Sequence, residues 1–189
     1  MTGLGLGPVA VLLPVKSFSE AKLRLAPALP PAARQALARD MATHVLRCAG
    51  RLPVAVVCDD VEVAAWAREH HALVVWEPER GLNRAVEAGV ERLASEGVER
   101  VIVAHADLAF AAELEWVGDF AGVTLVPDRG DNGTNVVGLP SRSGFAFSYG
   151  PGSFARHQAE ALRLGLPLRV VRAPDLARDV DLPSDLAHS

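Results

Sequence analysis

A single carboxylate and a pair of carboxylates follow apolar stretches of this chain, far apart in the sequence. Asp107 comes three residues after the apolar, largely β-branched run that ends at Ala104, and is preceded directly by His105-Ala106. Asp179-Val180-Asp181 lies near the C-terminal end of the sequence. Ligands of open parallel sheets bind beyond the carboxyl ends of the strands, where carboxylates from distant segments can meet. Such oxygens suit a hard cation such as Mg²⁺. The alternative is that Asp107 caps a helix beginning near Ala111.

Three cations follow the first apolar run, in a segment without a helical face. These are Lys16, Lys22 and Arg24. Cations in a loop above a sheet can hold a polyphosphate, although ordinary surface charge is the simpler interpretation. The loop is not a P-loop, because G-x-x-x-x-G-K-[ST] is absent.

Two loops with glycine offer sites for a ligand or for a plain turn. Gly81 and Asn83 stand at a predicted helix start, where Asn83 is either an N-cap or an amide for a base or ribose. Residues 130–135 form either a hairpin turn or a loop in which glycine lets the backbone approach a ligand, and Thr134 is the candidate contact there.

The segment Gly150-Pro151-Gly152-Ser153 precedes another predicted helix. Backbone amides and the Ser153 hydroxyl would converge at the helix N-terminus, which is a good site for phosphate or carboxylate. Ser153 as a simple N-cap is the alternative. The chain lacks G-x-S-x-G, so no serine nucleophile is indicated. Carboxylates, cations and glycine loops without a nucleophile favour phosphoryl chemistry, in which positioning and charge neutralisation supply most of the catalysis.

Apolar runs separated by amphipathic stretches predict the elements that carry these residues. We expect strands at 9–15, 54–58, 73–76, immediately before Asp107, and at 123–127 and 168–172, with short candidates at 136–139 and 145–148. We expect helices starting at 31, at 59–70, at 82–96, from about 111 through 120, from 153 to about 165, and at 183–186. Regular alternation predicts βαβ units: one three-layer, Rossmann-like α/β domain over 1–189, mainly parallel, with a short antiparallel excursion and a loose N-terminus at 1–8.

Composition narrows the class of protein. The net charge of −4 argues against a nucleic-acid-binding surface. Cys48 and Cys58 have neither disulfide nor zinc spacing. No apolar run is long enough for a membrane span, and the first residues lack the basic start of a signal peptide. We expect a cytoplasmic protein, and the sequence leaves a homodimer open.

The ordered set of motifs resembles the 2-phospholactate and phosphoenolpyruvate guanylyltransferases, which make a guanylated intermediate of the deazaflavin coenzyme of archaea and actinobacteria. The resemblance spans roughly Val9 to Leu186. It rests on Val11-Leu12-Leu13-Pro14-Val15-Lys16, Ala21-Lys22-Leu23-Arg24-Leu25, Gly81-Leu82-Asn83, His105-Ala106-Asp107-Leu108, Asp128-Arg129, Gly133-Thr134-Asn135, Gly150-Pro151-Gly152-Ser153 and Asp179-Val180-Asp181. Two positions depart from the family pattern: Ala109 replaces a proline, and Asp131-Asn132 replaces Gly-Thr, which bears on acceptor choice.

The resemblance implies a compact relative of the molybdenum-cofactor guanylyltransferase fold. It implies that Asp107 and Asp179 hold Mg²⁺ with Asp181 close by, and that Lys16, Lys22 and Arg24 lie along the GTP triphosphate. It also implies that Thr134, Gly150 and Ser153 contact a phosphorylated three-carbon acid. The expected reaction transfers GMP from GTP to that acid and releases pyrophosphate. The alternatives are nucleotide transfer to another small phosphate, such as a sugar phosphate, and a non-catalytic nucleotide-sensing domain.

Overall fold

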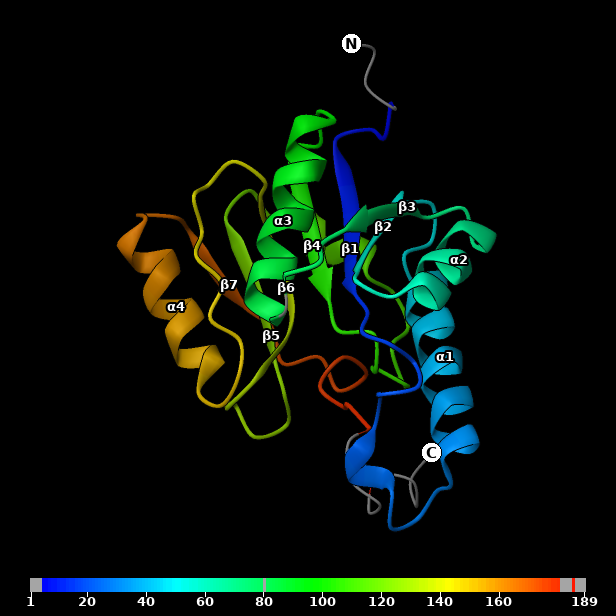
Figure 1. The fold of residues 1–189 in the computed structure, drawn as a ribbon. Helices are drawn as coiled ribbons and strands as arrows, with labels where there is room; N and C mark the ends of the chain where they lie inside the picture. Colours follow the sequence, from blue (N-terminus) through cyan, green and yellow to red (C-terminus); the bar gives the residue numbers. More distant parts are fainter. Residues whose placement is uncertain (1–4, 80, 181–184, 186–189) are drawn as a thin grey trace.

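The computed structural model describes residues 5–79, 81–180 and 185, and within them one seven-stranded sheet forms the middle layer of the molecule (Figure 1). Its strands are β1 (Val9–Pro14), β2 (Val54–Cys58), β3 (Leu73–Trp76), β4 (Arg100–Ala104), β5 (Val123–Pro127), β6 (Thr134–Pro140) and β7 (Leu168–Val170). Their order across the sheet is β3-β2-β1-β4-β6-β5-β7. The predicted strands at 54–58, 73–76 and 123–127 are confirmed at those bounds.

The pairing confirms a mainly parallel sheet with an antiparallel excursion. Strand β1 pairs in parallel with both β2 and β4, whereas β6 runs antiparallel between β4 and β5. Ala104 at the end of β4 therefore lies beside Val136, near the start of β6. This reversal brings the β5–β6 loop to the same edge of the sheet as the carboxyl ends of β1 and β4.

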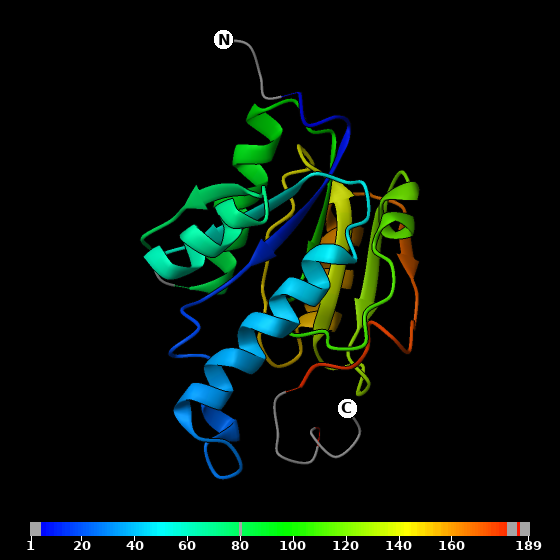
Figure 2. The same ribbon diagram turned by 90° about the vertical axis from the view of Figure 1, so that its right-hand side faces the viewer.

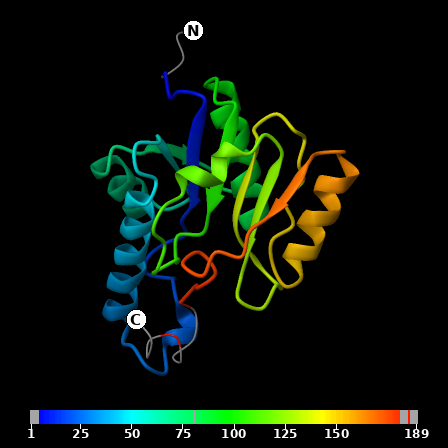
Figure 3. The ribbon, with the colours of Figure 1, turned by 180° about the vertical axis from the view of Figure 1, so that it is seen from behind.

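Helices cover both faces of the sheet, as the alternating pattern predicts. Helices α1 (Pro31–Arg47) and α2 (Val61–Glu69) pack on one face, with the 3₁₀ helix η2 (Glu115–Asp119). Helices α3 (Leu82–Ser95) and α4 (Ser153–Arg163) pack on the other. Figures 1 and 3 show the two faces, and Figure 2, turned by 90°, shows α1 running across the front of the molecule. Among the described residues, no helix is long and apolar enough to cross a membrane.

Local sequence explains where the helices begin. Pro31 stands at the first position of α1, where the missing N–H costs nothing. Asp60 caps α2, and its carboxylate accepts from the amides of Glu62 and Val63. In α3, Val86, Val90 and Leu93 are buried at helical spacing, as expected.

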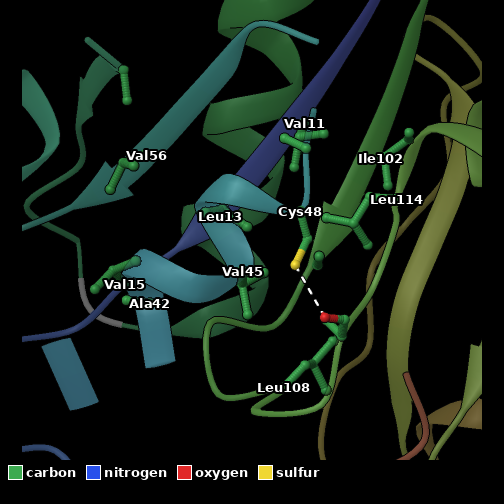
Figure 4. Packing of buried hydrophobic residues seen from close by; sticks show 14 of the residues in the cluster. Val11, Leu13, Val15, Ala42, Val45, Cys48, Val56, Ile102, Leu108 and Leu114 are labelled. Carbon is green, nitrogen blue, oxygen red and sulfur yellow. Dashed lines mark hydrogen bonds between the residues drawn. The ribbon is translucent and has the colours of Figure 1, made fainter. Parts of the chain in front are cut away.

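The predicted helix from about 111 through 120 is wrong, because only the short η2 forms there. Apart from short turn bonds, such as that from the Val117 amide to the Leu114 carbonyl, the backbone of this segment bonds to other parts of the chain, including the end of α1. The carbonyl of Ala111 accepts from the Cys48 thiol at 3.1 Å, the bond drawn as a dashed line from Cys48 in Figure 4. The amide of Leu114 donates to the Cys48 carbonyl at 3.0 Å. Burial also raises the pKa of the Cys48 thiol, which matches an inert buried cysteine.

The predicted strand at 145–148 is also wrong. The amides of Ala146 and Ser148 donate to side chains of α4, namely Glu160 and His157. With these donors satisfied by a helix, the segment has no ladder to join. The predicted helix at 183–186 lies outside the described residues except for Asp185.

Two further segments lie at the carboxyl edge of β1 and β4. The loop after β1 contains the 3₁₀ helix η1 (Leu23–Leu25), and residues 171–180 cross below the sheet in the view of Figure 1. Leu25 of η1, Met41 of α1 and Val180 form a small apolar cluster that joins these segments. The edge on which the site was predicted is thus enclosed by chain from both ends of the sequence.

Candidate active site

Asp107 and Lys22 form an ion pair at the carboxyl edge of the sheet. The Lys22 Nζ lies 2.6 Å from Asp107 Oδ2 and donates a hydrogen bond to it. The Lys22 side chain is only 8% exposed and that of Asp107 26%. Shielding from water makes this pair stronger than a surface ion pair. The structure therefore brings together a predicted cation ligand and a predicted phosphate ligand that are 85 residues apart.

The second carboxylate oxygen of Asp107 is buried and has no hydrogen-bond partner among the described residues. Burial raises the pKa of Asp107, but the charge of Lys22, that of His105 and the Lys22 hydrogen bond outweigh it, so the net direction is downward. The group is a carboxylate at neutral pH. The alternative role as a helix cap is wrong, because no helix begins near Ala111 and Asp107 Oδ2 faces Lys22.

The backbone at Lys22 explains how its side chain reaches Asp107. Lys22 adopts the left-handed conformation, with φ 55° and ψ 37°, directly before η1. Non-glycine residues in this region carry backbone strain, which the surrounding contacts must offset. Arg24 lies on η1 and is exposed, and Lys16 is exposed just after β1. The three cations thus share the β1–α1 loop, with Lys22 the one directed at the carboxylate.

The C-terminal acidic segment runs alongside Asp107. The amide of Val180 donates to the Asp107 carbonyl at 3.4 Å, so Asp179 is adjacent in the chain to a residue that touches Asp107. Asp181 lies outside the described residues. Among the residues that are described, no group of three or more His, Cys, Asp or Glu side chains gathers as a metal site. The predicted meeting of two acidic segments is supported at the level of the backbone.

Asn83 does not cap α3. The N-cap is Gly81, whose φ of 128° is accessible to glycine and strained for other residues. Asn83 lies inside the helix, and its side-chain oxygen accepts from the amide of Tyr149 at 2.7 Å. Asn83 therefore ties the start of α3 to the segment before Gly150.

The β5–β6 loop is stabilised by hydrogen bonds to the Asp128 carboxylate, and it also forms hydrogen bonds to the start of α4. Asp128 accepts from the amides of Gly130, Asn132 and Gly133 at 3.0, 2.9 and 2.7 Å. Asn132 in turn accepts from two amides of the next loop: its side chain from Gly152 at 3.0 Å, and its carbonyl from Phe154 at 3.2 Å. Two amides expected at an anion site are thus bonded to Asn132.

Thr134 and Ser153 meet in a buried network centred on His157. The Ser153 hydroxyl donates to Thr134 Oγ1 at 3.5 Å, and His157 Nδ1 lies 3.0 Å from the same oxygen. The amide of Ser148 donates to His157 Nε2 at 3.0 Å, so Nε2 is the acceptor and Nδ1 carries the hydrogen. Burial, followed by the charges of Arg156 and His105, lowers the pKa of His157 to about 4, so the ring is neutral.

The structure contradicts the expectation that Ser153 is a simple N-cap, and it agrees with the expectation that Ser153 lies near Thr134. Gly152, not Ser153, is the N-cap of α4, so the plain N-cap role is wrong. Thr134 at the start of β6 does contact Ser153 at the start of α4, and Gly150, in the loop before α4, is exposed with φ 111°. Sequence reasoning missed His157 and Asn132. The signal for His157 was its spacing of four from Ser153, which places both on one face of a helix.

Comparison with known proteins gives the family. The family model described as "Guanylyl transferase CofC like" matches residues 9–188. A phosphoenolpyruvate guanylyltransferase of Rubrobacter xylanophilus is 38% identical over 189 residues, covering 95% of this chain and 92% of the relative. One of Sphaerobacter thermophilus is 36% identical and covers 93% and 89%. A 2-phospho-L-lactate guanylyltransferase of Halorubrum lacusprofundi is 36% identical and covers 91% and 80%.

Solved structures share the fold at low sequence identity. A nucleotide-diphospho-sugar transferase homologue from Desulfovibrio desulfuricans G20 superposes with a TM-score of 0.76 at 15% identity, covering 95% of this chain and 84% of the other. A nucleotidyl transferase from Methanothermobacter thermautotroptrophicus gives 0.64 at 16%, covering 96% and 95%. At such identity the likeness concerns the fold alone.

Proposed function

Because the chain belongs to the guanylyl transferase CofC-like family, we propose that it transfers GMP from GTP to a phosphorylated three-carbon acid. The acids in question are phosphoenolpyruvate and 2-phospho-L-lactate, which the names of the relatives specify. The observation that carries the proposal is the family match over residues 9–188, with its motifs gathered at one edge of the sheet. The product would serve deazaflavin coenzyme biosynthesis, as the sequence resemblance implies.

The reaction needs few groups from the protein. A phosphate oxygen of the acceptor attacks the α-phosphorus of GTP in line. The bond between the α-phosphorus and the α–β bridging oxygen breaks, and pyrophosphate leaves with that oxygen. The nucleophile is already an anion, so no general base is required. Lys22, with Arg24 and Lys16 in the same loop, would neutralise charge on the triphosphate. Gly81 and Asn83 at the start of α3 form the remaining nucleotide side of the site.

Mg²⁺ is the proposed cofactor, held by Asp107 and Asp179 with Asp181 as the third candidate. The unpartnered Oδ1 of Asp107 fits a cation ligand, because a buried carboxylate oxygen without a donor leaves its charge uncompensated. Two carboxylates are enough protein ligands for a Mg²⁺ site, because Mg²⁺ commonly takes its other ligands from water and substrate phosphates. When bound, the ion would polarise the phosphoryl oxygens and neutralise their charge.

The acceptor side of the proposed site is formed by Thr134, Gly150 and Ser153. A hydroxyl has one hydrogen to donate and two lone pairs. The oxygen of Thr134 accepts from Ser153 and from His157, which leaves the Thr134 hydrogen for a substrate oxygen. The buried histidine would thereby set the direction in which Thr134 donates.

Pyrophosphate release tests the proposal. The purified chain would be assayed with GTP and, in turn, phosphoenolpyruvate, 2-phospho-L-lactate, 3-phosphoglycerate and a sugar phosphate, with and without Mg²⁺. We expect turnover with one or both of the first two acids and none without the metal. Turnover only with the sugar phosphate would assign a different acceptor. GTP binding without turnover on any acceptor would contradict an enzyme and favour a sensing domain.

A further inference from the structure

Two of the buried polar atoms that lack a partner belong to rings in contact with each other, and a third lies two residues along the chain from one of them. Within the described residues, such side-chain atoms are Arg34 Nε, His105 Nε2, Asp107 Oδ1, Ser143 Oγ and the Tyr149 hydroxyl. His105 is two residues from Asp107 after β4, and its ring centroid lies 5.2 Å from that of Tyr149. Asp107 Oδ1 suits a cation, but His105 and Tyr149 have no role in the function proposed above.

The ring of Tyr149 is held in place from several sides. It stacks on Phe147, with centroids 5.9 Å apart and planes at 4°, and meets the edge of His157 at 5.0 Å. Its backbone amide is fixed by Asn83. The hydroxyl position is therefore determined by packing, not by a hydrogen bond of its own.

A buried hydroxyl or imidazole nitrogen without a partner costs folding free energy, and native proteins contain few of them. Two such groups on neighbouring rings beside the proposed acceptor site indicate a ligand that completes their hydrogen bonds. We infer that the Tyr149 hydroxyl and His105 Nε2, with the imidazole in the tautomer that carries its hydrogen on Nε2, bind an anionic oxygen of the phosphorylated acid as a pair of donors from neighbouring loops. Burial raises the pKa of Tyr149, so the phenol keeps its hydrogen at neutral pH.

The surroundings of Tyr149 favour the acceptor over the nucleotide. Tyr149 directly precedes Gly150, and its ring contacts His157, which is bonded to Thr134 at 3.0 Å. His105 extends the same wall, because its amide donates to the carbonyl of Asn135 at 3.1 Å, next to Thr134. The inference rests on the proposed function, since it assigns two donors to the acceptor named there.

Tyr149→Phe provides the test, because it removes the hydroxyl and keeps the ring. We expect the KM for phosphoenolpyruvate to rise about tenfold, as for loss of one hydrogen bond to a charged group. The KM for GTP should stay unchanged. The melting temperature should stay the same or rise, because an unsatisfied buried hydroxyl is removed. A hydroxyl with only a structural role would instead lower the melting temperature and leave both KM values intact.

Two further variants sharpen the result. His105→Leu should raise the acceptor KM in the same way, and His105→Gln, which restores an N–H donor, should recover part of the loss. Ser143→Ala is the matched control: it removes another unpartnered buried hydroxyl, in the turn after β6 at the opposite edge of the sheet. It should change neither KM.

Calorimetric titration with phosphoenolpyruvate keeps the test independent of turnover, and Tyr149→Phe should bind about tenfold more weakly. Wild-type affinity for the acid in Tyr149→Phe would overturn the inference, as would a rise in the KM for GTP alone. Absence of turnover in the wild-type protein with every acid would instead contradict the proposed function. The two failures are thus distinguishable.

Discussion

His157 should make the stability of the protein depend on pH between about 4 and 6.5. The ring is fully buried, and its Nε2 accepts from the amide of Ser148. A proton on Nε2 would remove this acceptor and place a charge in the interior. The folded chain therefore resists protonation of His157, whereas the unfolded chain does not.

The direction and the magnitude of the change in unfolding free energy with pH follow from the pKa of the His157 ring. It falls from an ordinary 6.5 to about 4, mainly through burial. Between these values the unfolded chain binds more protons than the folded chain, so stability falls as pH decreases through the window. At ~1.4 kcal/mol per pKa unit, the full loss from this group is roughly 3 kcal/mol. The contribution is fully present above pH 6.5.

Urea unfolding at several pH values from 7.5 to 4.5 measures this loss. His157→Gln keeps an acceptor for the Ser148 amide and cannot titrate. We expect it to be about 1–2 kcal/mol less stable than wild type at pH 7.5, because a buried bond to Thr134 is lost or weakened, and to show a flatter pH profile. The control is His71→Asn at an exposed histidine with φ 58°, a conformation that Asn tolerates. It should keep the wild-type slope. A wild-type free energy of unfolding that stays constant from pH 6.5 to 4.5 would refute the reasoning.

Three more predictions concern single residues. Asp107→Asn should preserve the fold by circular dichroism and lower turnover roughly 10²-fold or more, and near-normal Mg²⁺-dependent pyrophosphate release would contradict its role. Lys22→Met should raise the KM for GTP and also lower the melting temperature, because it leaves the Asp107 carboxylate without its counter-charge; unchanged kinetics with a lower melting temperature would contradict the role in GTP binding and leave Lys22 with a structural role only. Gly138→Ala should destabilise the fold by about 1–3 kcal/mol in chemical denaturation, since the new Cβ would lie 2.6 Å from the Val117 carbonyl oxygen, whereas Gly130→Ala, whose nearest neighbour lies at 3.6 Å, should have little effect.

The strands were predictable because their sequences carry the signal locally. Val54–Cys58 and Val123–Pro127 are short apolar runs bounded by turn residues, and both strands appear at those bounds. The failures at 111–120 and 145–148 share a different cause. There the backbone bonds to groups outside the segment: to Cys48 more than 60 residues away in the first case, and to the side chains of His157 and Glu160 on the following helix in the second. The hydrophobic pattern of the segment itself does not reveal such partners.

In the site, too, the position of the residues at one edge of the sheet could be predicted from the sequence, whereas their individual bonds could not. Strand ends predicted that Asp107 and the cationic loop share one edge, and the ion pair of Asp107 with Lys22 agrees. The pairing itself depends on a left-handed backbone at Lys22, which residue type does not favour. The bonds of Asn83 to Tyr149 and of Asn132 to Gly152 are side-chain choices between loops, so a capping pattern in the sequence could not predict them.

The reversed direction of β6 has an evolutionary consequence. Because β6 runs against its neighbours, the chain leaves the site edge at Thr134 and returns to it at Gly150, within one continuous segment. The cations and α3, which we propose bind the nucleotide, come from residues before 96. A recombination or a few substitutions confined to residues 128–157 could therefore exchange one acceptor for another while the nucleotide half is inherited intact. Relatives that use different acids would then be expected to diverge most in this segment, and a chimera that transplants it should carry the acceptor preference of its donor.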